Sequence, residues 1–143
     1  MRRLLLSVAL MLIATPALAG GITVSHAMLR TITPAVPAAG YFDLRNGTAT
    51  AITLTGARSS ACGDMMMHRS DGEGGMMRMA MTPQIAVAPG ARLSFRPGSY
   101  HLMCEHPSPA LFTAHAATVT LTFQGGTMLD VTFAVVDAKG TQR

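Results

Sequence analysis

Four side chains that could bind a soft metal ion follow a regular spacing in the second half of the chain. They are His68, Met79, His101 and Met103, separated by ten, twenty-one and one residues. Thioether sulfur and imidazole nitrogen together form a soft donor set, which favours Cu(I) over harder cations. Because methionine has no proton to lose, it can hold a metal where protons or oxidants would disable a thiolate. The four residues are therefore a candidate Cu(I) site.

Methionine is also abundant around this pattern. Seven of the twelve methionines lie between Met65 and Met81. Methionine commonly fills gaps in protein cores, and a single histidine in a strand is more often a structural polar group than a ligand. Packing is therefore the alternative to metal binding. The combination of a His-x-Met segment with a histidine beside a methionine run favours the metal site.

The rest of the sequence predicts a single all-β domain. Short segments rich in β-branched and aromatic residues are separated by glycine and proline, which is typical of an antiparallel sandwich or barrel. No segment after the first nineteen residues has a convincing helical periodicity. The expected strands are residues 22–32, 41–45, 51–57, 65–69, 76–81, 85–88, 93–96, 100–104, 118–124 and 129–136.

Three segments are expected to be irregular. Residues 71–75, with the sequence Asp-Gly-Glu-Gly-Gly, predict the turn of a hairpin between the two methionine-rich strands. Residues 107–117 are the longest irregular stretch and are expected to form a surface loop. Residues 137–143 are short and polar, which predicts a frayed tail.

Strand geometry indicates which donors can converge. Residues two apart in a strand lie on the same face, about 6.6 Å apart along the strand, so His101 and Met103 share one face. The predicted hairpin would bring His68 close to Met79. Packing is the favoured interpretation of the other nearby methionines, and alternative ligation or an oxidisable shield is the second. These methionines are Met65, Met66, Met67, Met77 and Met81.

The first nineteen residues have the features of an export signal. Arg2 and Arg3 form a basic start, residues 4–13 form an apolar core, and a small-x-small cleavage site ends at Ala19. We therefore expect residues 1–19 to be a signal peptide that is cleaved near Ala19/Gly20. The mature domain would span residues 20–143 and would not insert stably into a membrane.

Composition argues against nucleic-acid binding. Loss of Arg2 and Arg3 lowers the eleven basic side chains to nine, against seven acidic ones, so the net charge falls from +4 to +2. The basic residues are scattered, and there is no tryptophan to stack on bases. Nucleic-acid sites usually combine a basic stripe with stacking aromatic side chains.

The two cysteines, Cys62 and Cys104, allow several interpretations. A disulfide is favoured in an oxidising compartment, and free thiols that assist copper exchange are the next possibility. Direct ligation is least expected, because Cys104 would face away from His101 and Met103 within its strand.

With these residues in view, the chain resembles the periplasmic copper chaperone family PCu(A)C. The family signature is a His, ten residues, a Met, twenty-one residues and then His-x-Met, which matches His68, Met79, His101 and Met103 without a gap. The resemblance extends roughly from residue 22 to residue 136. It implies a cupredoxin-like antiparallel β-barrel or sandwich that binds one Cu(I) ion through these two His nitrogens and two Met sulfurs.

The resemblance also implies a function. A periplasmic chaperone without catalysis of its own would carry copper, as a monomer, to a copper-accepting protein. That acceptor is expected to be a cytochrome c oxidase subunit or another assembly factor. Some relatives have a Met- and His-rich C-terminal extension, whereas residues 137–143 contain neither residue, so a second copper site in the tail is not expected.

Other functions fit the sequence less well. An electron-transfer copper protein needs two His, a Cys and an axial Met, but no methionine follows Cys104 before Met128. An exported thiol-disulfide protein usually has a Cys-x-x-Cys motif, and a serine hydrolase a Gly-x-Ser-x-Gly motif; this chain has neither. A metal-free exported β-domain for adhesion or assembly would explain the strands but not the donors. The remaining histidines, His26, His106 and His115, are not required by any spacing, and the last two are expected to face solvent.

Overall fold

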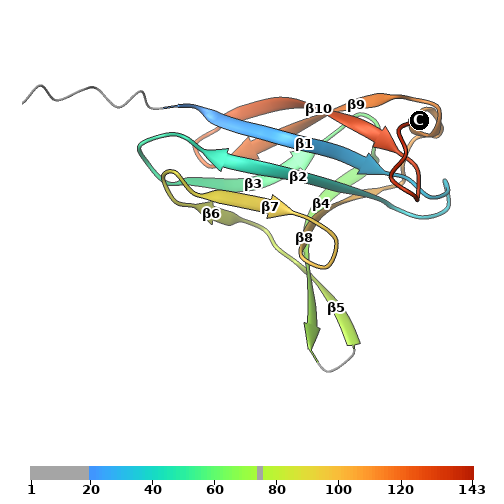
Figure 1. Ribbon diagram of the computed structural model, residues 1–143, viewed down its shortest axis with the longest axis horizontal. Helices are drawn as coiled ribbons and strands as arrows, with labels where there is room; N and C mark the ends of the chain where they lie inside the picture. The colour runs from blue at the N-terminus through green and yellow to red at the C-terminus, as the bar shows by residue number, and fades with distance from the viewer. Residues whose placement is uncertain (1–19, 74–75) are drawn as a thin grey trace, which may run out of the picture.

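The computed structural model describes residues 20–73 and 76–143 and confirms the all-β prediction (Figure 1). Its strands form one sheet in the order β5-β4-β8-β7-β2-β1-β10-β9-β3-β6. A short 3-10 helix, η1 (Pro109–Phe112), precedes β9. The strands are β1 (Ile22–Arg30), β2 (Ala38–Asn46), β3 (Ile52–Arg58), β4 (Asp64–Glu73), β5 (Met76–Met81), β6 (Ile85–Val87), β7 (Arg92–Phe95), β8 (Tyr100–Glu105), β9 (Ala116–Phe123) and β10 (Met128–Val136).

The sheet curls where β8 meets two other strands. One edge of β8 pairs with β4, and the other pairs with β2 and, at a single residue pair, with β7. Gly40 on β2 lies opposite Leu102 on β8, and a Cβ atom at Gly40 would lie only 2.9 Å from the Cβ of Leu102. Glycine at position 40 therefore permits the close approach of β2 and β8. As a result, the outer faces of β4, β8 and β2 form one continuous surface.

The inner face of the sheet forms the hydrophobic core. Phe42 on β2 stacks on Phe95 on β7 with 4.3 Å between ring centroids, and it meets Phe133 on β10 edge to face at 5.7 Å. Burying one such side chain contributes about 1.5–3 kcal/mol. Leu102 and Cys104 of β8 are fully buried in the same core. The alternation of β8 therefore directs His101 and Met103 to the outer face, as their spacing predicts.

The predicted hairpin of methionine-rich strands is confirmed, but its predicted turn is too long. β4 continues through Glu73, and Asp71 and Gly72 pair with Arg78 and Met77 of β5. Cross-strand pairing thus overrides the turn propensity of Asp and Gly. Gly74 and Gly75, the rest of the predicted turn, lie outside the described residues, as does the predicted signal peptide, residues 1–19. The ends of β4 and β5 project from the body of the sheet (Figure 1).

Two other expectations about irregular segments need correction. The expected loop of residues 107–117 contains η1 with the buried Leu111, and β9 already begins at Ala116. The tail is attached rather than frayed, because Gln142 pairs with Val136 and the Arg143 guanidinium donates to Thr31 Oγ1 at 2.9 Å.

The sheet is also less uniformly antiparallel than expected. β1 pairs with β10, and β7 with β8, in parallel. Among the described residues, no helix has the length and apolar character needed to cross a bilayer.

Candidate metal centre

The two histidines of the predicted site face each other across β4 and β8. His68 and His101 are direct partners in the antiparallel ladder, so their side chains lie on the same face. Their ring centroids are 5.7 Å apart and the ring planes are inclined by 83°. This arrangement places four imidazole nitrogens in one small region of the outer face.

Methionines flank the histidine pair on three sides. Met66 lies opposite Met103, one step along the β4–β8 ladder from the histidines. On β5, which pairs with the edge of β4 away from β8, Met81 lies opposite His68. Met79 lies opposite Ser70, two residues further along β4. Rows on one face of a strand are about 6.6 Å apart. These four methionines therefore lie on the same face as the two histidines. Their long, flexible side chains can reach the imidazoles.

The centre is enclosed on one side and open on the other. His101 is only 8% exposed, and Met66, His68 and Met103 are half-buried. By contrast, Met79 and Met81 on the edge strand β5 are 63% and 65% exposed. A metal ion bound by the histidines would thus be accessible to another molecule from the side of β5.

A cavity of about 340 Å³ adjoins the site. Its lining includes Met79, His101 and Met103, together with Ser70 and Tyr41. Three of the four predicted ligands therefore border a common cavity, and the fourth, His68, stands beside His101 at the distance given above.

The electrostatic environment favours the neutral form of the His68 imidazole. Burial lowers the pKa of His68 below its ordinary value of 6.5, and the nearby His101 lowers it further, whereas Glu105 opposes the shift. His68 Nδ1 is buried and has no hydrogen-bond partner among the described residues. His101 Nδ1 lies 3.3 Å from the carbonyl oxygen of Ser99. A neutral, unpaired ring nitrogen is the form of histidine that can bind a metal ion.

A disulfide supports the site from behind. Cys62 and Cys104 are bonded, as favoured from the sequence, and they link the segment before β4 to β8. Since both cysteines of the chain are used, the thiolate required by a blue-copper centre is missing. Cys104 is fully buried and Cys62 is half-buried, so attack by an external thiolate is hindered at Cys104.

The structure divides four of the five extra methionines into two groups, while the side chain of Met77 lies outside the described part of the chain. Met65 and Met67 are buried in the core, which confirms packing for these two. Packing is wrong for Met81, which is mostly exposed beside His68, and Met66 lies on the outer face beside Met103. Their positions follow from strand parity with His68 once the hairpin register is known.

The three histidines outside the pattern do not line the cavity at this centre. His106 and His115 are exposed, as predicted. His26 is also exposed, and its Nδ1 lies 3.0 Å from Asp43 Oδ2 on the outer face of β1 and β2.

Comparison with known proteins supports this description of the fold. The family model LpqE-like matches residues 22–135. The copper-bound PCuAC domain from PmoF2 superposes with a TM-score of 0.67 at 21% identity, covering 85% of this chain and 97% of that chain. The solution structure of CuI-DR1885 from Deinococcus radiodurans has a TM-score of 0.66 at 27% identity, covering 83% and 80%.

The solution structure of apo-DR1885 from Deinococcus radiodurans has a TM-score of 0.62 at 21% identity. The match covers 99% of this chain and 100% of that chain. No curated protein matches the chain in sequence. The family model spans most of the chain, and the solved structures named above share its curled sheet. The chain therefore belongs to the LpqE-like family and has the fold of the PCuAC domains.

Proposed function

We propose that this chain is a copper carrier that binds one Cu(I) ion on the outer face of β4, β5 and β8. His68, His101 and Met103 are the ligands on β4 and β8, and Met79 is the ligand on β5. The observation that carries this proposal is the in-register pair of histidines surrounded by thioethers. Relatives of the same fold include a copper-bound PCuAC domain and a CuI form of DR1885, which supports copper as the ion.

The donor set suits Cu(I) chemically. Imidazole and thioether ligands are neutral, so the bound ion keeps its single positive charge, and soft thioethers favour Cu(I) over harder ions. The buried, unpaired Nδ1 of His68 would gain a partner on metal binding. The low pKa of His68, caused first by burial, keeps this ring neutral and available near neutral pH.

Release to another protein is the second part of the proposal. The exposed Met79 of β5 can leave the ion first, and an acceptor with thiolates would replace it by ligand exchange. We infer that the acceptor is a copper-accepting protein of the periplasm, with a cytochrome c oxidase subunit or another assembly factor as the expected identity. The support for this identity is the family resemblance, and the chain's own function would be transfer rather than catalysis.

X-ray absorption of the Cu(I)-loaded protein tests the site directly. We expect one bound copper per chain with both sulfur and nitrogen donors, and sharply weaker binding in His101→Ala and Met103→Ala in a competition titration. Met128→Ala is the matched control, because Met128 is an exposed methionine on β10, far from β8 in the sheet. Parent-like Cu(I) affinity in both site variants would falsify the assignment.

A further inference from the structure

The outer face that carries the histidine pair continues onto β2 and β7. Met103 on β8 lies opposite Ala39 on β2, so the outward residues of β2 lie on the same side of the sheet as the candidate metal centre. These residues include Tyr41, Asp43 and Arg45. A protein docked on β2 would therefore extend toward the metal centre without turning around an edge.

Two arginines lie directly opposite each other on this continuation. Arg45 of β2 and Arg92 of β7 are ladder partners, and both are exposed. Like charges directly opposite on neighbouring strands destabilise a sheet. In the described part of the chain, neither arginine forms an ion pair with a carboxylate. The fold therefore tolerates charge repulsion between Arg45 and Arg92. An acidic residue at either position would remove this repulsion.

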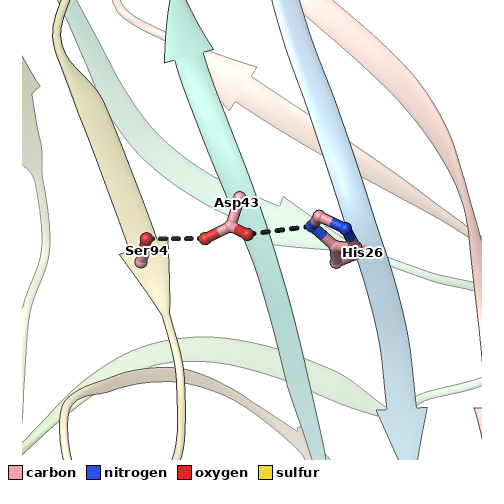
Figure 2. A network of polar contacts seen from close by, with 3 residues as sticks. All are labelled: His26, Asp43 and Ser94. Atoms are coloured by element: carbon pink, nitrogen blue, oxygen red, sulfur yellow. Dashed lines mark hydrogen bonds and ion pairs between the residues drawn. The ribbon is translucent and has the colours of Figure 1, made fainter.

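The carboxylate of Asp43, which lines a depression together with Arg45 and Arg92, is already engaged by a hydroxyl and an imidazole. Ser94 Oγ donates to Asp43 Oδ1 at 2.6 Å, and His26 Nδ1 lies 3.0 Å from Asp43 Oδ2 (Figure 2). His26 occupies an irregular position of β1 with a positive φ of 53°, which turns its ring toward Asp43. Both oxygens of Asp43 are thus held between β1 and β7, and among the described residues this carboxylate forms no ion pair with Arg45 or Arg92.

A second cavity, of about 650 Å³, lies on the same face. Among the described residues, its lining includes three arginines, Arg30, Arg92 and Arg96, and a single acidic residue, Asp43. The cavity shares Tyr41 and Pro97 with the smaller cavity at the metal centre. A basic depression therefore borders the proposed copper site directly.

We propose that the outer face formed by Arg30, Arg45, Arg92 and Arg96, here called the arginine face, docks an acidic surface of the protein that exchanges copper with this chain. The inference rests on the proposed copper function and names the chemistry of its partner. Complementary charge raises the rate of encounter and sets the orientation of a complex more than its final affinity. An acidic partner on this face would place its own copper ligands beside Met103 and the exposed methionines of β5.

Transfer kinetics with two defined acceptors test this proposal. The acceptors are peptides with the same Cys-x-x-Cys pair, flanked by glutamates in one and by lysines in the other. We expect the acidic peptide to remove Cu(I) from the loaded protein about tenfold faster at low salt. The difference should vanish when ionic strength rises from about 10 mM to about 1 M, because the Debye length falls from about 30 Å to about 3 Å.

Charge-reversal variants assign the effect to this face. Arg92→Glu should abolish the preference for the acidic peptide, and Arg45→Glu should do the same, while Cu(I) affinity stays at the parent value. Either change creates an Arg–Glu pair in register, so the fold is retained. Arg58→Glu on β3 is the matched control with the same change in net charge, and it should keep the preference; β3 is separated from β7 by four strands.

The outcomes separate the two proposals. Equal rates with both peptides, or a preference that survives Arg92→Glu and Arg45→Glu, would overturn the arginine face although copper binding stands. Loss of the preference in Arg58→Glu as well would also overturn it, since net charge alone would then explain the effect. Failure of the parent protein to bind Cu(I) would instead overturn the proposed function.

Discussion

His68 and His101 are direct cross-strand partners, with ring centroids 5.7 Å apart and nearly perpendicular planes. Burial first, and then the nearby His101, lower the pKa of His68 below its ordinary value of 6.5. The fold itself therefore favours a neutral nitrogen donor at His68. Because the segment just before β4 is also joined to β8 through the Cys62–Cys104 disulfide, the two histidines are the fixed part of the site.

Met79 and Met81 on β5 form the adjustable part, and this leads to a first prediction. Met81 lies opposite His68, whereas Met79 lies one row further along. Since both are exposed and within reach of the same centre, Met81 should substitute for Met79 as a ligand. Met79→Leu alone is then expected to weaken Cu(I) binding modestly, by up to about tenfold, and Met79→Leu with Met81→Leu to weaken it much more.

Competition titration with a Cu(I) chelator measures the loss of Cu(I) affinity in the single and in the double variant. Met128→Leu, at an exposed methionine on β10, is the control for loss of a surface thioether. If the double variant binds Cu(I) no more weakly than Met79→Leu, Met81 has no part in the site.

The hairpin register also marks the limit of sequence-based prediction. The spacing of His68, Met79, His101 and Met103 selects residues that the structure brings to one face. It does not give the position of Met81, because the register depends on how far β4 continues. Asp71 and Gly72 favour a turn locally, but pairing with β5 keeps them extended.

Other features depend on contacts between distant parts of the chain. Alternation in β2 predicts that Phe42 faces the core, yet it cannot show that β1 pairs in parallel with β10. The tail is polar in sequence, and it is fixed by Arg143, which reaches Thr31 more than one hundred residues earlier. Such long-range contacts leave no local pattern for the sequence to reveal.

The disulfide should contribute substantially to stability. The bond between Cys62 and Cys104 closes a sequence separation of 42 residues, and in the chain-entropy model a loop of this size stabilises the fold by about 4 kcal/mol, with about 2–4 typical. The double variant Cys62→Ser, Cys104→Ser should therefore unfold at lower denaturant concentration. Urea unfolding of parent and variant, both without metal, measures the difference.

The reduced parent serves as the control, because it lacks the bond but keeps both sulfur atoms. It should unfold close to the serine variant. Equal midpoints for the oxidised parent and the double variant would show that the bond does not stabilise the domain.

The contact between β2 and β8 gives a third prediction. In Gly40→Ala, the added Cβ would lie 2.9 Å from Leu102 Cβ and 3.3 Å from a side-chain carbon of Leu29. The Leu102 Cβ is fixed to the backbone, so the strands must separate, at an expected cost of about 1–3 kcal/mol. Thermal and urea unfolding measure this loss.

Gly21→Ala is the matched control for this substitution. A Cβ at Gly21 would meet nothing within 4 Å, so the variant should be as stable as the parent. Comparable stability of Gly40→Ala and Gly21→Ala would show that β2 and β8 are not held at contact distance.

The hydrogen bonds of Asp43 predict how its carboxyl group titrates and how this group affects stability at low pH. The Ser94 hydroxyl, followed by His26, lowers the pKa of Asp43 below 3.8. A carboxylate whose pKa is depressed by folding stabilises the folded state above its unfolded pKa, and this contribution is lost as the pH falls from about 3.9 through the lower folded value. Ser94→Ala removes the largest cause, so the pKa of Asp43 should rise toward 3.8, as measured by NMR titration of its carboxyl carbon. Thr120→Ala removes a hydroxyl donor from a different aspartate, Asp130, and should leave Asp43 unchanged. An identical Asp43 titration in the parent and in Ser94→Ala would mean that the contact between β2 and β7 does not hold this carboxylate in solution.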